Sequence, residues 1–262
     1  MPVDRLKRSE MSPFGHAAEL YEEVRPGWPR ALVADAARFA GISPDSRVVE
    51  VGCGTGKATR LFAPLCREII CIEPDLAMLD VARRVLKQRK NVRFVESTFE
   101  EWPLGPDGAD LLISAQAFHW VKPEIGYEKA GRALKPGGSV ALFWHVDRPH
   151  HDALRQAMDV AYREHAPELT YRAPGGQPGS RDIAALLERT GLFGPVSKHE
   201  YPRSKAYDAD TWLKMLSTFS DHIRLPEERR LRLFDALRRV METHGVAYRN
   251  RLVTTLFLAK RV

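Results

Sequence analysis

The chain has 262 residues, of which 44% are apolar and 28% are charged. This composition is typical of a folded globular protein, and it excludes collagen-like repeats and a largely disordered chain. The longest apolar runs, such as residues 110–115, are much too short to cross a bilayer, so no membrane partner is expected. The net charge of +6 comes from scattered basic residues rather than one block, so we do not expect a nucleic-acid partner.

The N-terminus and the cysteines indicate the compartment. The first ten residues carry charges of both signs and no apolar segment, which is unlike a secretory signal. The cysteines are odd in number and lack metal-finger spacing, which indicates reduced thiols at Cys53, Cys66 and Cys71. We therefore expect a cytoplasmic protein without a disulfide framework.

The first half of the chain alternates short β-branched runs with helical stretches. This pattern predicts strands at 47–51, 68–73, 91–95, 109–114 and 139–144, separated by helices at 57–65, 74–88 and 124–134. The last of these helices is followed by Lys135-Pro136-Gly137-Gly138, a strong turn signal. Strands separated by helices predict βαβ units, and hence a doubly wound α/β fold with a mostly parallel sheet.

The pattern changes after position 147. Helices are predicted at 152–164, 181–190, 209–219 and 226–243, and strands at 196–204 and 251–259. Four regions follow: an N-terminal arm or lid (1–29), a cofactor-binding core (30–147), a C-terminal region with cap helices and a sixth strand (148–245), and a final strand that completes the core sheet (246–262).

A glycine-rich segment ends the first predicted strand: Val48-Val49-Glu50-Val51-Gly52-Cys53-Gly54-Thr55-Gly56-Lys57. A P-loop would need glycine at position 51 and Ser or Thr at position 58, which are Val and Ala. A dinucleotide fingerprint would need a third glycine at position 57, which is Lys. The carboxylate of Glu50 would repel a pyrophosphate, and it suits a ligand with a cationic amine instead.

This segment resembles the first motif of class I S-adenosylmethionine-dependent methyltransferases, and further segments fit that family in order. Cys71-Ile72-Glu73-Pro74 places an acid where the family binds both ribose hydroxyls, and Ser97-Thr98-Phe99-Glu100 lies where it frames the adenine. Leu134-Lys135-Pro136-Gly137-Gly138 resembles the turn before the family's fifth strand. The resemblance implies a Rossmann-like fold with seven strands and a helical cap, with S-adenosyl-L-methionine as cofactor and S-adenosyl-L-homocysteine as product.

A narrower resemblance concerns the segments 115–120 (Ala-Gln-Ala-Phe-His-Trp) and Tyr21-x3-Arg25-Pro26-Gly27-Trp28-Pro29. Both are similar to a subgroup that contains trans-aconitate methyltransferase and related small-molecule enzymes, whose characterised members methylate carboxylates. Many class I enzymes have Asp where this chain has Thr98, and the subgroup often has Thr. The resemblance therefore implies a small-molecule substrate. If the methylated group is a carboxylate, this substrate is an acid.

The candidate cofactor-binding residues come from these motifs and from the N-terminal arm: Tyr21, Arg25, Glu50, Gly52, Cys53, Gly54, Gly56, Glu73, Pro74, Thr98, Phe99, Gln116 and Ala117. His119 is the candidate general base, and the alternative is a histidine that packs with Trp120 and shapes the loop. No metal is expected, because two adjacent histidines such as His150 and His151 rarely converge on one ion.

The expected reaction is direct SN2 transfer of a methyl group to a bound nucleophile, with a carboxylate oxygen as the favoured acceptor. A carboxylate is already ionised at neutral pH and needs no general base. Two alternatives stay open: a methyltransferase acting on RNA or protein, and a non-catalytic protein that binds S-adenosylmethionine. The sequence carries no signal for one oligomeric state.

Overall fold

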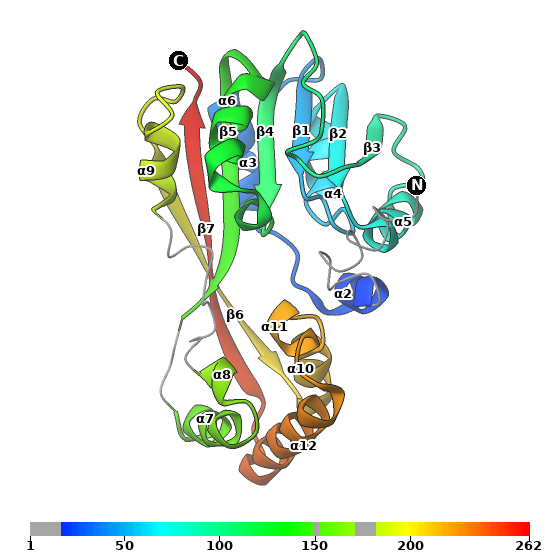
Figure 1. Ribbon diagram of the computed structural model, residues 1–262, viewed down its shortest axis with the longest axis vertical. Coiled ribbons are helices and arrows are strands. Elements are labelled where there is room, and N and C mark those ends of the chain that lie inside the picture. The colour runs from blue at the N-terminus through cyan, green and yellow to red at the C-terminus, as the bar shows by residue number, and fades with distance from the viewer. Residues whose placement is uncertain (1–16, 149–151, 171–181) are drawn as a thin grey trace.

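One seven-stranded sheet runs through the molecule in the order β3-β2-β1-β4-β5-β7-β6 (Figure 1). The computed structural model describes residues 17–148, 152–170 and 182–262. The first five strands are parallel: β1 (Arg47–Val51), β2 (Glu68–Glu73), β3 (Val92–Glu96), β4 (Ala109–Ala115) and β5 (Leu134–Asp147). Antiparallel to β5 lies β7 (Tyr248–Lys260), and β6 (Ser197–Tyr207) pairs antiparallel with β7.

The central strands are apolar because both faces of the sheet are covered. Val48 and Val49 of β1 and Leu111 and Leu112 of β4 are at most 2% exposed. Such continuous β-branched and leucine-rich runs are typical of parallel strands that lie between two helical layers. The predicted doubly wound, mostly parallel fold is confirmed.

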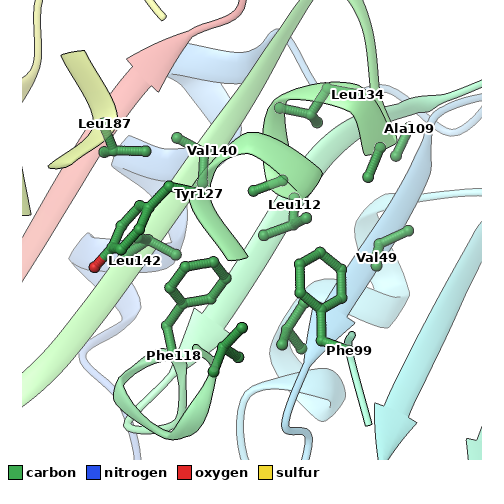
Figure 2. Packing of buried hydrophobic residues seen from close by; sticks show 14 of the residues in the cluster. Val49, Phe99, Ala109, Leu112, Phe118, Tyr127, Leu134, Val140, Leu142 and Leu187 are labelled. Atoms are coloured by element: carbon green, nitrogen blue, oxygen red, sulfur yellow. The ribbon is translucent and has the colours of Figure 1, made fainter. Parts of the chain in front are cut away.

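Helices cover both faces of this sheet. On one face α3 (Arg30–Ala40), α4 (Thr59–Phe62) and α5 (Leu76–Val85) contribute to a buried cluster with β1, β2 and β4. On the other face lie α6 (Pro123–Ala133), α9 (Ile183–Glu188) and the segment after β3. Figure 2 shows this second cluster, in which the ring of Phe118 lies between those of Phe99, on the side of Val49, and Tyr127, on the side of Leu187.

A second group of helices packs against the far ends of three long strands. Strands β5, β6 and β7 have 14, 11 and 13 residues, and they extend well past the short parallel strands (Figure 1). The helices there are α7 (Ala153–His165), α8 (Pro167–Thr170), α10 (Ala209–Leu216), α11 (Ser220–Ile223) and α12 (Glu227–His244). We call this group the cap; α7, α8, α10 and α12 share an apolar cluster of their own. Across the described ranges, no helix combines the length and apolarity needed to span a bilayer.

Two predicted boundaries differ from the structure for identifiable reasons. The helix predicted at 57–65 is reduced to α4 and the 3-10 turn η2 (Ala63–Leu65), because the glycines at 52, 54 and 56 take positive φ and hold the preceding chain in turns. The turn predicted at 135–138 lies inside β5, where the pairing with β4 shifts register after Ala109. Gly137 at φ 75° lets the strand continue past this irregularity.

The described part of the N-terminal arm contains a helix that the sequence pattern did not predict. Helix α2 (Ala18–Val24) lies between α5 and the cap, close to the end of the sheet where β1 and β2 finish (Figure 1). Its small apolar side contacts α5 through Ala18, while Leu20 and Val24 join the cap cluster. The arm therefore bridges the core and the cap.

Candidate active site

The carboxyl ends of the parallel strands bring the glycine loop against the loop after β4. Gly52 N–H and Cys53 N–H donate to the Ile72 carbonyl (2.8 and 3.2 Å), which turns the chain sharply at the end of β1. A Cβ on Gly52 would lie 2.4 Å from the Cβ of Ala117, and the φ of Gly52 is 69°. Only glycine fits this contact. It lies where the strand order reverses, which is the place where open α/β sheets bind ligands.

Glu73 connects the ends of β1 and β2. Gly54 N–H donates to its Oε2 (2.9 Å), and Asp75 N–H donates to its Oε1 (3.1 Å). Burial raises the pKa of Glu73 to about 7, although the two backbone donors oppose this rise. Each carboxylate oxygen can accept a second hydrogen bond. The carboxylate is thus fixed in position with capacity left for a ligand that carries two neighbouring hydroxyls.

Glu50 is the most unusual acid of the site, with 0% of its surface exposed. Its Oε2 accepts from Thr59 Oγ1 (2.6 Å), while its Oε1 has no hydrogen-bond partner within the described part of the chain. Burial raises its pKa to about 8, and the nearby Glu73 carboxylate contributes to this rise. A buried acid without a counter-charge is costly, and a cation brought by a ligand would relieve that cost.

Gln116 carries backbone strain at the end of β4. Its φ of 60° is the only positive value found for a non-glycine residue within the described ranges. The strain is held by two hydrogen bonds to β5: Gln116 N–H donates to the Phe143 carbonyl (2.9 Å), and Gln116 Oε1 accepts from His145 N–H (2.8 Å). Strain of ~1–3 kcal/mol that the surroundings maintain is typical of ligand-binding positions.

The arm helix α2 is attached to the glycine loop by one carboxylate. Glu22 Oε2 accepts from Thr55 Oγ1 (2.7 Å), and Glu22 also pairs with Lys57 and Arg60. The Lys57 Nζ donates to the Glu22 backbone carbonyl (2.6 Å). These contacts hold the arm over the loop that approaches the ligand.

Arg25 attaches the same arm to the cap. Its guanidinium donates to Thr218 Oγ1 and to the Thr218 carbonyl (both 2.8 Å), and it lies between the rings of Tyr21 (5.1 Å) and Phe219 (4.1 Å). Burial lowers the pKa of Arg25, and burial raises the pKa of Tyr21, with a further rise from Glu73. Tyr21 therefore lies near the Glu73 carboxylate, whereas the partners of Arg25 are Tyr21 and residues of the cap.

The remaining candidate residues occupy different environments. Thr98 Oγ1 accepts from Glu101 N–H (3.2 Å) in the turn after β3, whereas Phe99 is only 3% exposed and belongs to the cluster in Figure 2. Pro74 lies between the fixed Glu73 and Asp75, and the buried Cys53 thiol faces the Cys71 thiol, which raises its pKa.

The candidate base is held by packing. His119 Nδ1 accepts from the indole N–H of Trp144 on β5 (3.4 Å), and its ring lies 5.1 Å from that of Trp120. Within the described ranges, no three His, Cys, Asp or Glu side chains form a group that could hold a metal ion. His150 and His151 lie outside the described residues.

Sequence reasoning missed three residues that shape this site: Glu22, Thr59 and Thr218. Each partners a residue that the motifs did identify, but Glu22 and Thr218 are 33 and 193 positions from the residues they bind. Thr59 offered a signal, because a hydroxyl early in the helix after a glycine loop can reach back to an acid on the preceding strand.

The comparisons with known proteins agree with this geometry. Residues 49–142 match a family described as a methyltransferase domain. The chain is 34% identical over 147 residues to a probable S-adenosylmethionine-dependent methyltransferase, CRG1, of Saccharomyces cerevisiae, covering 55% of this chain and 50% of that protein. It is 26% identical over 143 residues to a trans-aconitate 2-methyltransferase of Afipia carboxidovorans, covering 53% of this chain and 54% of that protein. The matched segments thus span about half the length of these curated relatives.

The similarity of the fold extends further than these alignments. The crystal structure of the YcgJ protein from Bacillus subtilis superimposes with a TM-score of 0.58 and 18% identity, covering 89% of this chain and 99% of that one. The strand order and the matched segment lead to one conclusion: residues 49–142 form a methyltransferase domain on a Rossmann-like sheet, similar to those of S-adenosylmethionine-dependent methyltransferases.

Proposed function

We propose that the chain methylates a small molecule that binds between the carboxyl edge of the sheet and the cap, and that the acceptor atom is a carboxylate oxygen. The observation that carries the proposal is that the arm contacts both the glycine loop and the cap, and that the cap contacts the loop after β4. The arm is hydrogen-bonded to the glycine loop through Glu22 and to the cap through Arg25, and the guanidinium of Arg224 in the cap lies 5.7 Å from the ring of Trp120 after β4. An edge that the arm and the cap approach from two sides favours a small acceptor over RNA or a folded protein.

The residues of the edge suit the cofactor in the following roles. Glu73 would accept from the two ribose hydroxyls, and the backbone of the loop at Gly52 and Gly54 would lie against the amino-acid part. Glu50 would support the cationic amine through its charge. Thr98 and the backbone at Phe99 would frame the adenine, and Gln116 and Ala117 would form the wall towards the acceptor.

The bound cofactor supplies an electrophilic methyl group on a sulfonium, which transfers in line without a covalent enzyme intermediate. The contribution of the chain is to align the two reactants and to exclude water. Holding two reactants in line contributes up to ~7–11 kcal/mol in favourable cases. The cap and the α2 arm would exclude water from the bound reactants, which makes such positioning effective.

The histidines at this edge favour an acceptor that needs no base. Burial lowers the pKa of His145 to about 3, so its ring, which stacks on Trp28 at 4.1 Å, is too weakly basic to take a proton near pH 7. His119 is held against Trp144. Arg25 is not free for an acidic acceptor, because it donates to Thr218 and the charges of Asp147 and Asp221 act on it. The relative named for trans-aconitate methylation fits an acidic acceptor.

The test is turnover with S-adenosylmethionine and a panel of small acids, followed as formation of S-adenosylhomocysteine. We expect acid-dependent turnover by the wild-type protein and by His119→Ala, with rates within about threefold of each other, because a carboxylate needs no general base. The product should release methanol on mild alkaline hydrolysis, as a methyl ester does. Turnover with phenols or amines but not acids, abolished by His119→Ala at unchanged cofactor affinity, would contradict the carboxylate assignment.

A further inference from the structure

A basic cleft lies at the opposite edge of the sheet, where β1, β2 and β3 begin. It has a volume of about 390 Å³ and is open to solvent. Its lining includes the first residue of β1, Arg47, and the first residue of β2, Glu68, together with Arg67, Lys90 and Arg93. The parallel strands separate this cleft from the edge that carries Glu73.

Positive charge dominates this cleft. Four cationic side chains line it with a single carboxylate, Glu68, and that carboxylate is already paired with Arg47 (3.2 Å). Among the described residues, no Asp or Glu lies within ion-pair distance of Arg67, Lys90 or Arg93. Three exposed cations without an ion-pair partner among the described residues therefore border one open cleft.

The neighbouring peptide carbonyls do not need these basic side chains as hydrogen-bond donors. Peptide carbonyls at a helix end can attract basic side chains, but here the Asn91 amide donates to the carbonyls of Ala63 and Cys66 (2.7 and 2.9 Å). Elsewhere on the surface, arginines such as Arg38 and Arg132 pair with an acid one helical turn away. Arg47 is neutralised by Glu68 and Asp107, but Arg67, Lys90 and Arg93 have no such partner among the described residues, so their charge is available to a ligand.

We propose that this cleft binds the diphosphate group of a small anion, either as free pyrophosphate or as part of a nucleotide. Guanidinium groups match phosphate oxygens through paired N–H donors, and a lysine adds a point charge. Several cations around one cavity favour a ligand with several negative charges over a monocarboxylate. The site is separate from the cofactor edge and does not depend on the identity of the methyl acceptor.

Calorimetric titration with pyrophosphate and with ADP at low ionic strength tests the proposal. We expect a dissociation constant on the order of 0.1 mM for at least one of them, weakening as salt is added because the cleft is open to solvent. Binding of ADP but not pyrophosphate would identify a nucleotide as the source of the diphosphate, and binding of both with equal affinity would identify the diphosphate alone. The double variant Arg67→Gln/Arg93→Gln should weaken binding at least ~10-fold.

The matched control removes two exposed arginines elsewhere, Arg163→Gln/Arg189→Gln, which changes the net charge equally and should leave the affinity unchanged. Both variants should bind S-adenosylhomocysteine like the wild type, which shows that they are folded. Absence of binding by both anions, an equal loss in the two double variants, or displacement of the anion by S-adenosylhomocysteine would overturn the proposal.

Discussion

Replacing Glu50 by Gln should stabilise the ligand-free protein at pH 8 and weaken its binding of S-adenosylhomocysteine. The pKa of this carboxyl is about 8 in the folded chain against 4.5 in the unfolded one, so the folded state holds a proton that the unfolded state has lost. Stability therefore falls as the pH rises from about 4.5 through about 8, by on the order of 4 kcal/mol at pH 8. Glutamine carries no charge and removes this dependence.

The gain in stability at pH 8 is smaller than the full cost of ionising the buried Glu50, because the substitution introduces a buried amide. That amide has two N–H donors, and Oε1 has no hydrogen-bond partner among the described residues; leaving the donors unsatisfied costs ~1–3 kcal/mol. Urea denaturation should thus show Glu50→Gln more stable than wild type by ~1–3 kcal/mol at pH 8, and no more stable at pH 5. The ligand amine loses a carboxylate, so the affinity for S-adenosylhomocysteine should fall at least ~10-fold.

Glu96→Gln is the matched control, since Glu96 is an exposed acid at the end of the neighbouring strand β3. It should change neither the pH dependence of stability nor the affinity. A stability difference for Glu50→Gln that is the same at pH 5 and pH 8, or an unchanged affinity, would contradict the role assigned to Glu50.

Gly52→Ala should be the most damaging single-methyl change in the glycine loop. The new Cβ would lie 2.4 Å from the Cβ of Ala117 at a residue with φ 69°. The left-handed backbone costs ~1–2 kcal/mol for a residue with a side chain, and overpacking adds ~1–3 kcal/mol. Thermal denaturation should show this loss, and S-adenosylhomocysteine affinity should fall because the loop moves away from the ligand.

Two further variants separate the backbone strain from the clash. At Gly54 the φ is 53° and no atom lies within 4 Å of an added Cβ, so Gly54→Ala should show only the backbone cost. Ala117→Gly removes the opposing methyl group. The double variant Gly52→Ala/Ala117→Gly should therefore recover the part of the stability loss that comes from the clash. Equal losses for Gly52→Ala and Gly54→Ala, with no recovery in the double variant, would show that the two loops do not touch.

The sequence predicts the sheet well because parallel strands carry a local signal. The buried runs at β1, β2 and β4 have their own apolar signature, and the glycines before α4 mark the turn by their backbone freedom. The order of the motifs along the chain then places Glu50, Glu73 and Gln116 at one edge, because the carboxyl ends of parallel strands meet there.

What the sequence does not show are contacts between distant segments. The salt bridges of Glu22 and the hydrogen bonds of Arg25 to Thr218 depend on how the arm and the cap lie on the core. Helix α2 has only seven residues, too few for its periodicity to be distinctive. The burial of Phe99 in the core cluster likewise reflects packing that its position after β3 does not reveal.

The central claim is that the carboxyl edge of this sheet binds S-adenosylmethionine, and calorimetric titration tests it most directly. The purified protein should bind S-adenosylmethionine and S-adenosylhomocysteine with dissociation constants on the order of micromolar, and it should not bind NADH. Glu73→Ala should weaken the binding of S-adenosylmethionine and of S-adenosylhomocysteine, because the ribose hydroxyls lose their acceptor. Folded protein that binds neither sulfur ligand, or that binds NADH instead, would contradict the account.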